Sequence, residues 1–137
     1  MAWTMLIAPV AVAAAQGATD VGAGHPLRAV LLDALRPAIA ADLGQPVRFV
    51  VTKLRVQGDW AFAVVRPQTP AGQWIDFART HYAERQREGM LDGDTVHALL
   101  RREKGAWRVK DFVIGPTDVA WDAWPQQYGV PRGLLFR

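Results

Sequence analysis

Hydrophobic side chains crowd two similar stretches of the chain, residues 47–67 and 95–116. Each stretch consists of two runs rich in Val, Ile, Phe, Trp and Thr that meet at a glycine, Gly58 or Gly105. This composition favours a pleated, half-buried strand, and glycine supplies the positive φ that a tight reversal needs. We therefore predict two β-hairpins.

The spacing around the two glycines is the same, Arg-x-x-Gly-x-Trp. If each hairpin loop has two residues and ends at its glycine, an arginine faces a tryptophan in both hairpins: Arg55 opposite Trp60, and Arg102 opposite Trp107. Each guanidinium can then rest on an indole ring, a contact of about 0.5–1 kcal/mol. The simpler interpretation is that both pairs only fix the strand register.

The first hairpin is apolar on both faces, which predicts a central position covered on both sides. Strict alternation divides its side chains into two sets: Phe49, Val51, Phe62 and Val64 on one face, and Val50, Leu54, Ala61, Ala63 and Val65 on the other.

The side chains of the second hairpin alternate between a face directed to the core and a solvent-exposed face. The expected core residues are Val96, Ala98, Leu100, Trp107 and Val109, and the expected outer residues are His97, Arg101, Arg108 and Lys110. Phe112 and Ile114 are out of phase with Val109, and a bulge near Asp111 would return both to the core.

Residues 27–43 have helical spacing of apolar side chains, and Gly44 is a natural stop. Pro37 predicts either a kink or a helix that ends near Arg36 and is followed by a second, short one. We expect this helix to pack on the small side chains of the first hairpin.

The rest of the chain adds short elements. We interpret residues 19–25 as a linker, and we interpret residues 80–88 as a polar segment that is compatible with a helix. Trp121, Trp124 and Tyr128 share one face of a short C-terminal helix. The predicted fold class is α+β: an N-terminal helix packed on an antiparallel sheet of about four strands, followed by a short C-terminal helix, as one domain over residues 19–137.

Residues 1–18 contain no charged side chain, and a small-x-small pattern ends at Ala15. We interpret this stretch as a secretory signal peptide cut after Ala15 or Ala18, which predicts a periplasmic or secreted protein. The apolar run is too short to span a bilayer, so no transmembrane span is expected in the mature chain. The alternative is a buried apolar arm of a cytoplasmic protein.

Composition and net charge narrow the range of functional classes. The 137 residues carry a formal net charge of +3 and no cysteine. A mild basic excess is far from the dense basic stripe of a dedicated nucleic-acid binder. Without cysteine, the chain has no disulfide, no thiol nucleophile and no Cys-ligated metal. No motif predicts a cofactor, and we expect no metal site.

Candidate catalytic residues are few. The chain lacks His-x-x-x-His, Gly-x-Ser-x-Gly and the glycine-rich phosphate loops. His81 with Asp76 and Tyr82 is the best candidate set for acid–base catalysis, because a histidine paired with a carboxylate could be poised near neutral pH; Asp111 is a further candidate. A surface histidine beside a solvated helix is the simpler interpretation. Asp92 and Asp94 flank a glycine in a turn-like stretch that lacks the ligands of a calcium loop.

Candidate binding residues are more numerous. On the second hairpin, Arg101, Arg108 and Lys110 form a basic outer face that attracts anions, although the wet side of any antiparallel sheet has this character. The tryptophans Trp74, Trp121 and Trp124 either line a ligand pocket or interface, or close the ends of the sheet.

The second hairpin, residues 98–109, resembles the late hairpin of NTF2-like and cystatin-like α+β domains. The resemblance implies one helix lying across a curved antiparallel sheet. Enzymes of the NTF2-like class carry an Asp/His or Asp/Tyr set inside the cone, and no inward-pointing His or Asp is placed here by the pattern. The whole chain is also similar to small exported bacterial proteins, which implies a compartment and no activity.

Three functions follow as hypotheses. The preferred one is a non-enzymatic exported module that binds an envelope protein, a small ligand or a second copy of itself. The alternative is a small NTF2-like enzyme or ligand-binding cone that uses His81, Asp76 or Asp111. The third is binding of an anion or a nucleic acid through the face of Arg101, Arg108 and Lys110, which predicts strongly salt-dependent binding.

Overall fold

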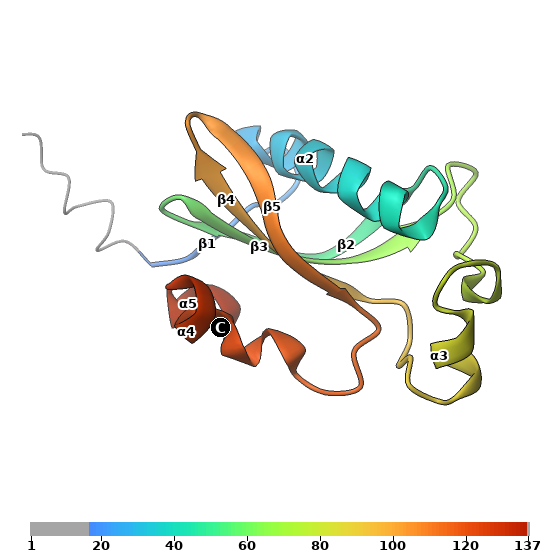
Figure 1. Ribbon diagram of the computed structural model, residues 1–137. Helices are drawn as coiled ribbons and strands as arrows, with labels where there is room; N and C mark the ends of the chain where they lie inside the picture. The colour runs from blue at the N-terminus through green and yellow to red at the C-terminus, as the bar shows by residue number, and fades with distance from the viewer. Residues whose placement is uncertain (1–16, 137) are drawn as a thin grey trace, which may run out of the picture.

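The computed structural model describes residues 17–136, which form one antiparallel sheet with helices on both faces (Figure 1). The elements follow the chain in this order: β1 Thr19–Asp20, α2 Pro26–Leu43, β2 Arg48–Gln57, β3 Trp60–Gln68, η1 Phe77–Arg79, α3 Ala83–Arg87, β4 Val96–Glu103, β5 Ala106–Ile114, η2 Ala120–Ala123, α4 Trp124–Tyr128 and α5 Arg132–Leu135. The predicted α+β class is confirmed. The proposed signal peptide lies almost wholly outside the described residues.

The sheet has five strands in the order β1-β2-β3-β4-β5, not about four. The additional strand lies in the stretch expected to be a linker, where Thr19 pairs with Val56 and Asp20 with Arg55. The buried Val21 donates its backbone N–H to Leu54 O at 2.8 Å, which extends this pairing. A two-residue strand carries too little alternation to be recognised in a sequence.

Helix α2 packs on one face of the sheet, hereafter the inner face (Figure 1). Its buried side chains are Leu31, Leu35, Ile39 and Leu43, which share a core with Ala61, Ala63 and Val65 of β3, as predicted. The helix is continuous through Pro37, which is exposed, and ends at Gly44 in the left-handed conformation with φ 71°. The packing of the four buried side chains compensates for the hydrogen bond that proline removes.

A β-bulge at Thr52 changes the predicted faces of the first hairpin. Val51 pairs with Val65, but Lys53 pairs with Val64, so Thr52 is the additional residue. Phe49 and Val51 consequently pack with the inner core, not on the face of Phe62 and Val64, and Val50 is exposed. The loop is also one residue later than predicted, because Gln57 pairs with Trp60 and Arg55 with Phe62.

The second hairpin agrees with its predicted pattern. Arg102 lies opposite Trp107, and the side chains expected in the core belong to the inner core or pack against it. The expected bulge is present: Leu99 pairs with Asp111 and Leu100 with Val109, which leaves Lys110 as the additional residue. Phe112 and Ile114 return to the inner side as a result.

A second core lies on the opposite face of the sheet, hereafter the outer face. It is formed by buried residues of β3, β4 and the C-terminal segment: Trp60, Phe62, Val64, Leu99, Trp124, Val130, Leu134 and Leu135. The predicted C-terminal helix is divided into η2 and α4, with Pro125 in the first turn of α4. Residues 116–136, hereafter the C-terminal cover, therefore form a third layer (Figure 1). Within residues 17–136, none of the helices combines the length and apolarity that crossing a bilayer requires.

Candidate ligand-binding face

Three cross-strand rows of side chains run over the outer face of β2, β3, β4 and β5. The central row is Arg55, Phe62, Leu99 and Asp111; the row on one side of it is Lys53, Val64, His97 and Val113; the row on the other side, at the hairpin ends, is Gln57, Trp60, Arg101 and Arg108. The C-terminal cover closes the central row and leaves both ends of the face partly accessible.

The central row holds the C-terminal cover in place. The Trp124 ring meets the Phe62 ring edge-on at 6.3 Å between centroids. The buried Arg55 Nη1 donates to Leu134 O at 3.1 Å. The Tyr128 hydroxyl donates to Asp111 Oδ2 at 2.8 Å, and this hydrogen bond raises the pKa of Tyr128. Asp111, a candidate catalytic residue in the sequence, is thus an anchor for the cover.

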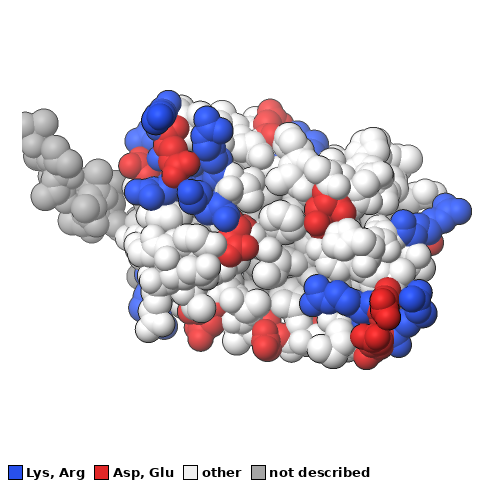
Figure 2. Space-filling model, in the orientation of Figure 1, with Lys and Arg blue, Asp and Glu red and all other residues white. Residues whose placement is uncertain are grey.

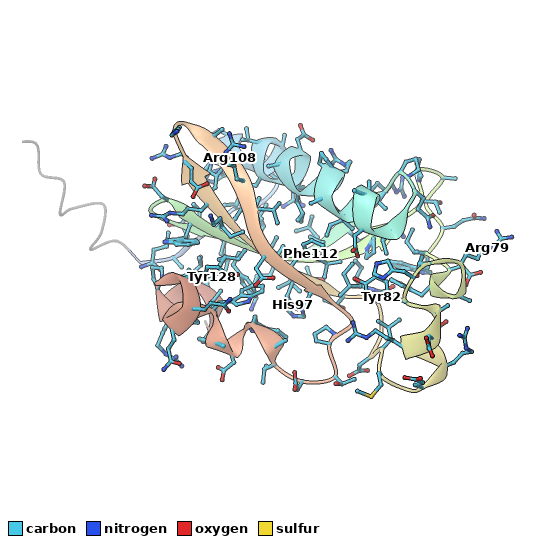
Figure 3. The ribbon with its side chains drawn as sticks, in the orientation of Figure 1. Arg79, Tyr82, His97, Arg108, Phe112 and Tyr128 are labelled. Atoms are coloured by element: carbon cyan, nitrogen blue, oxygen red, sulfur yellow. The ribbon has the colours of Figure 1, made fainter. Side chains whose placement is uncertain are left out.

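His97 lies under the C-terminal cover, on the side of the sheet opposite α2 (Figure 3). Its ring stacks on Trp121 with centroids 3.8 Å apart and planes 8° from parallel. Burial lowers the pKa of His97, and the charge of Lys53 lowers it further, so the ring is neutral at pH 7. His97 Nδ1 is buried without a hydrogen-bond partner in the described part of the chain, a cost of about 1–3 kcal/mol.

A cleft of about 490 Å³ opens beside this stacked pair. Its walls come from the start of β4, the loop after β5 and η2: Asp92, Thr95, His97, Pro116, Thr117, Asp118, Val119 and Trp121. The sequence pattern placed His97 among solvated basic residues, but the cover separates it from them. The alternation of side chains along β4 does not depend on where the C-terminal cover packs. The sequence pattern therefore could not predict the burial of His97.

The basic end of the outer face is formed by the β4–β5 hairpin, where Lys and Arg side chains gather (Figure 2). Arg101 and Arg108 are directly opposite each other in the ladder. The Arg101 guanidinium lies over the Trp60 ring at 4.9 Å from its centroid. A shallow cleft of about 590 Å³ is lined by Arg101, Arg102, Glu103, Lys104 and Arg108.

Only part of the positive charge at this end is neutralised. Arg102 pairs with Asp59 at 2.8 Å and Lys110 with Glu103 at 3.2 Å. Within residues 17–136, no carboxylate lies within ion-pair distance of Arg101, Lys104 or Arg108. Two like charges directly opposite in a ladder repel each other by about 0.2–1 kcal/mol. The hairpin end therefore carries unneutralised cations at a cost in stability.

His81 lies in a separate cluster at the end of α2. Its Nε2 is 3.1 Å from Asp42 Oδ1, and the Tyr82 hydroxyl donates to Asp42 Oδ2 at 2.6 Å. Burial raises the pKa of Tyr82, and the hydrogen bond to Asp42 raises it further. The predicted partner of His81 is wrong in detail: the carboxylate is Asp42, and Asp76 instead accepts from Ala78 N as the cap of η1.

The structure does not bring the three catalytic candidates together. Figure 3 places Tyr82, the neighbour of His81, and Tyr128, the partner of Asp111, toward opposite ends of the sheet. Asp42 was missed because it lies 39 residues from His81, on the polar side of α2. Residues 17–136 also contain no group of three or more His, Asp or Glu placed to hold a metal ion.

The three candidate tryptophans are likewise separated. Trp124 is 3% exposed in the outer core, Trp121 covers His97, and Trp74 is 48% exposed after β3. The Arg66 guanidinium lies 3.8 Å from the Trp74 ring centroid and forms two hydrogen bonds to Asp94, at 2.7 and 3.1 Å. The hydrogen bonds to Asp94 raise the pKa of Arg66.

Comparison of the chain with models of protein families, with curated proteins and with solved structures finds no match. The resemblance to NTF2-like domains therefore stays an expectation drawn from the sequence.

Proposed function

We propose that the protein is a non-enzymatic binding module of the cell envelope, and that it binds an anionic partner through the basic end of the outer face. The observation that carries the proposal is the pair Arg101 and Arg108, two arginines directly opposite each other in the strand ladder with no carboxylate partner among the described residues. An anion bound between them offsets their repulsion, and guanidinium groups bind carboxylate or phosphate oxygens bidentately.

Trp60 prepares this surface for binding. The ring is 9% exposed and fixed in the outer core, so the Arg101 guanidinium rests on a rigid support. A stacked guanidinium keeps its N–H edges free for an anion and loses less conformational entropy on binding than a mobile one. Lys104, in the loop next to this pair, adds charge without a partner of its own in the described residues.

The experiment substitutes Arg108→Glu and measures binding of poly-L-glutamate and of phosphatidylglycerol vesicles at several salt concentrations. The variant places a carboxylate opposite Arg101, so folding stability is expected to rise by about 0.2–1 kcal/mol while binding weakens by about tenfold or more. Loss of binding with a gain in stability separates a lost site from a misfolded protein.

The matched control is Arg79→Glu, which makes the same charge change on an exposed residue of η1. Figure 3 places Arg79 and Arg108 toward opposite ends of the molecule. Binding that is insensitive to salt, or that both variants weaken equally, contradicts the proposed site. A preference for vesicles over polyglutamate identifies a lipid surface as the partner, and the reverse identifies an acidic polymer.

The cell-envelope location rests on the uncharged start of the chain. Ala18 packs against the outer core, a contact that cleavage after Ala15 retains and cleavage after Ala18 removes. We therefore expect the mature chain to begin at Gln16. Sequencing of its N-terminus checks this, and a chain that still begins at Met1 contradicts export.

A small NTF2-like enzyme is the alternative proposal, and the pairing of His81 with Asp42 favours it. We rank the binding module above the enzyme because the His81 side chain is 59% exposed, whereas acid–base catalysis gains most in a site that excludes water.

A further inference from the structure

A second cleft lies on the outer face at the opposite end from the basic hairpin, beside the stacked rings of His97 and Trp121. The proposed function does not use it. Its volume of about 490 Å³ is within the range of small-molecule sites, which run from about 300 to 1,000 Å³.

The cleft combines a rigid aromatic wall with an apolar rim. Trp121 is held flat against His97, and His97 in turn lies 6.2 Å from the Phe62 ring in the outer core. Pro116 and Val119 line the cleft as well, and Val119 is 55% exposed. An exposed valine beside an indole is a surface that a ligand with an apolar body can cover.

The charge of the cleft is opposite to that of the protein as a whole. Asp92 and Asp118 line it, and neither forms an ion pair with another described residue. Among residues 17–136, no Lys or Arg lines the cleft; Lys53 acts on His97 from β2, on the far side of β3. The neutral His97 ring adds no positive charge at pH 7.

The surroundings of His97 favour one tautomer of its neutral ring. Because Nδ1 is buried without a partner in residues 17–136, the tautomer that leaves an acceptor there is favoured over one that leaves an N–H donor unpaired. The proton then lies on Nε2. His97 consequently contributes an uncharged, fixed ring to the cleft.

We propose that this cleft is a binding site for a small organic cation, an amine or guanidinium attached to an apolar body. The cationic group is held by the carboxylates of Asp92 and Asp118. The apolar body packs on Trp121 and Val119. The site goes beyond the proposed function, because it takes a ligand of the opposite charge at the other end of the face.

The test uses the whole chain and follows the imidazole Cε1–H resonances of its three histidines by NMR. The probes are benzylamine, the uncharged benzyl alcohol and the anionic benzoate, which share one ring. Benzylamine is expected to shift the His97 resonance saturably and to leave those of His25 and His81 unchanged. Benzyl alcohol is expected to bind about tenfold more weakly, and benzoate not at all.

The double variant Asp92→Asn with Asp118→Asn is expected to weaken benzylamine binding by about tenfold. Its matched control is Glu84→Gln with Glu88→Gln, which removes the same charge from exposed positions at α3 and leaves binding unchanged. Both pairs of residues are exposed, so both variants are expected to fold.

Thermodynamic linkage between benzylamine binding and protonation of His97 provides an independent measurement. A bound cation disfavours a second positive charge nearby, so benzylamine is expected to lower the pKa of His97 measured by NMR titration. The proposal is overturned if benzylamine leaves the His97 resonance unshifted, if benzyl alcohol binds as well as benzylamine, or if the double variant binds benzylamine unchanged.

Discussion

His97 illustrates how one residue acquires its properties from a layer that its own strand does not encode. On β4 it is the neighbour of core residues and faces outward. The C-terminal cover then places Trp121 on it with ring centroids 3.8 Å apart, and the ring becomes partly buried. Removal from water disfavours the charged imidazolium, which is why the pKa falls below its ordinary value.

This shift predicts how stability depends on pH. In the unfolded chain His97 titrates near pH 6.5, but in the folded protein it binds its proton only at lower pH. Between these two values the unfolded state holds more protons, so the free energy of unfolding falls as the pH decreases. The contribution is complete above about pH 6.5 and is lost as the pH falls through the folded-state pKa.

Urea denaturation of the wild type and of His97→Phe at a series of pH values between about 7.5 and 5 measures the effect. The phenylalanine keeps the stacking ring and removes the titration, while the other two histidines are present in both proteins. The variant is expected to lose less stability on acidification. Equal slopes for the two proteins refute the assignment.

At the scale of elements, the C-terminal cover is made of pieces that cannot fold alone. Helix α4 has 5 residues and α5 has 4, far below the roughly 12–15 residues at which isolated helices become marginal. Their stability comes from burial of Trp124, Leu134 and Leu135 against β3 and β4. The cover is therefore a packed layer and not an independent helical unit.

The two tryptophans Trp124 and Trp74 provide a matched test of this view. Trp124→Ala removes a ring that is 3% exposed and is expected to cost about 3–5 kcal/mol. Trp74→Ala removes a ring that is 48% exposed and stacked under Arg66, and is expected to cost about 1 kcal/mol or less. Urea denaturation of both variants measures the difference, and similar costs for the two contradict the three-layer packing.

Sequence patterns predicted those elements in which one face differs from the other. Alternation gave the second hairpin and its bulge because inner apolar and outer basic residues are distinct. The bulge at Thr52 was not predicted because both faces of the first hairpin are apolar, so a shift of one residue leaves the hydrophobic pattern unchanged. Helix α2 was predicted with its end at Gly44, whereas the sequence left open whether the helix kinks at Pro37 or ends near Arg36; the structure has one helix, Pro26–Leu43.

For the candidate site, the sequence predicts only those residues that a single hairpin brings together. Arg101 and Arg108 share a face by alternation alone, and the structure places them opposite each other. The support of Arg101 on Trp60 comes from the neighbouring strand, and the one-residue shift of the first loop concealed it. Asp42 and His81 meet only through tertiary packing, about which local periodicity carries no information.

At the scale of the whole molecule, the central strand β3 connects two cores. Its alternate side chains Ala61, Ala63 and Val65 enter the inner core under α2, and Trp60, Phe62 and Val64 enter the outer core under the cover. Neither layer can be lost without exposing one side of the same strand. We therefore expect both cores to unfold in one cooperative transition.

Two leucine truncations test this coupling, Leu35→Ala in α2 and Leu134→Ala in α5, each at a side chain that is 0% exposed. Each is expected to lower the free energy of unfolding by about 2–5 kcal/mol, and hydrogen exchange of the β3 amides is expected to accelerate by the corresponding factor in both variants. If Leu134→Ala accelerates exchange in α5 but leaves the β3 amides protected as in the wild type, the cover opens on its own. The cleft beside His97 would then open and close with the cover, while the basic hairpin end would keep its geometry, because its strand pairing belongs to the sheet.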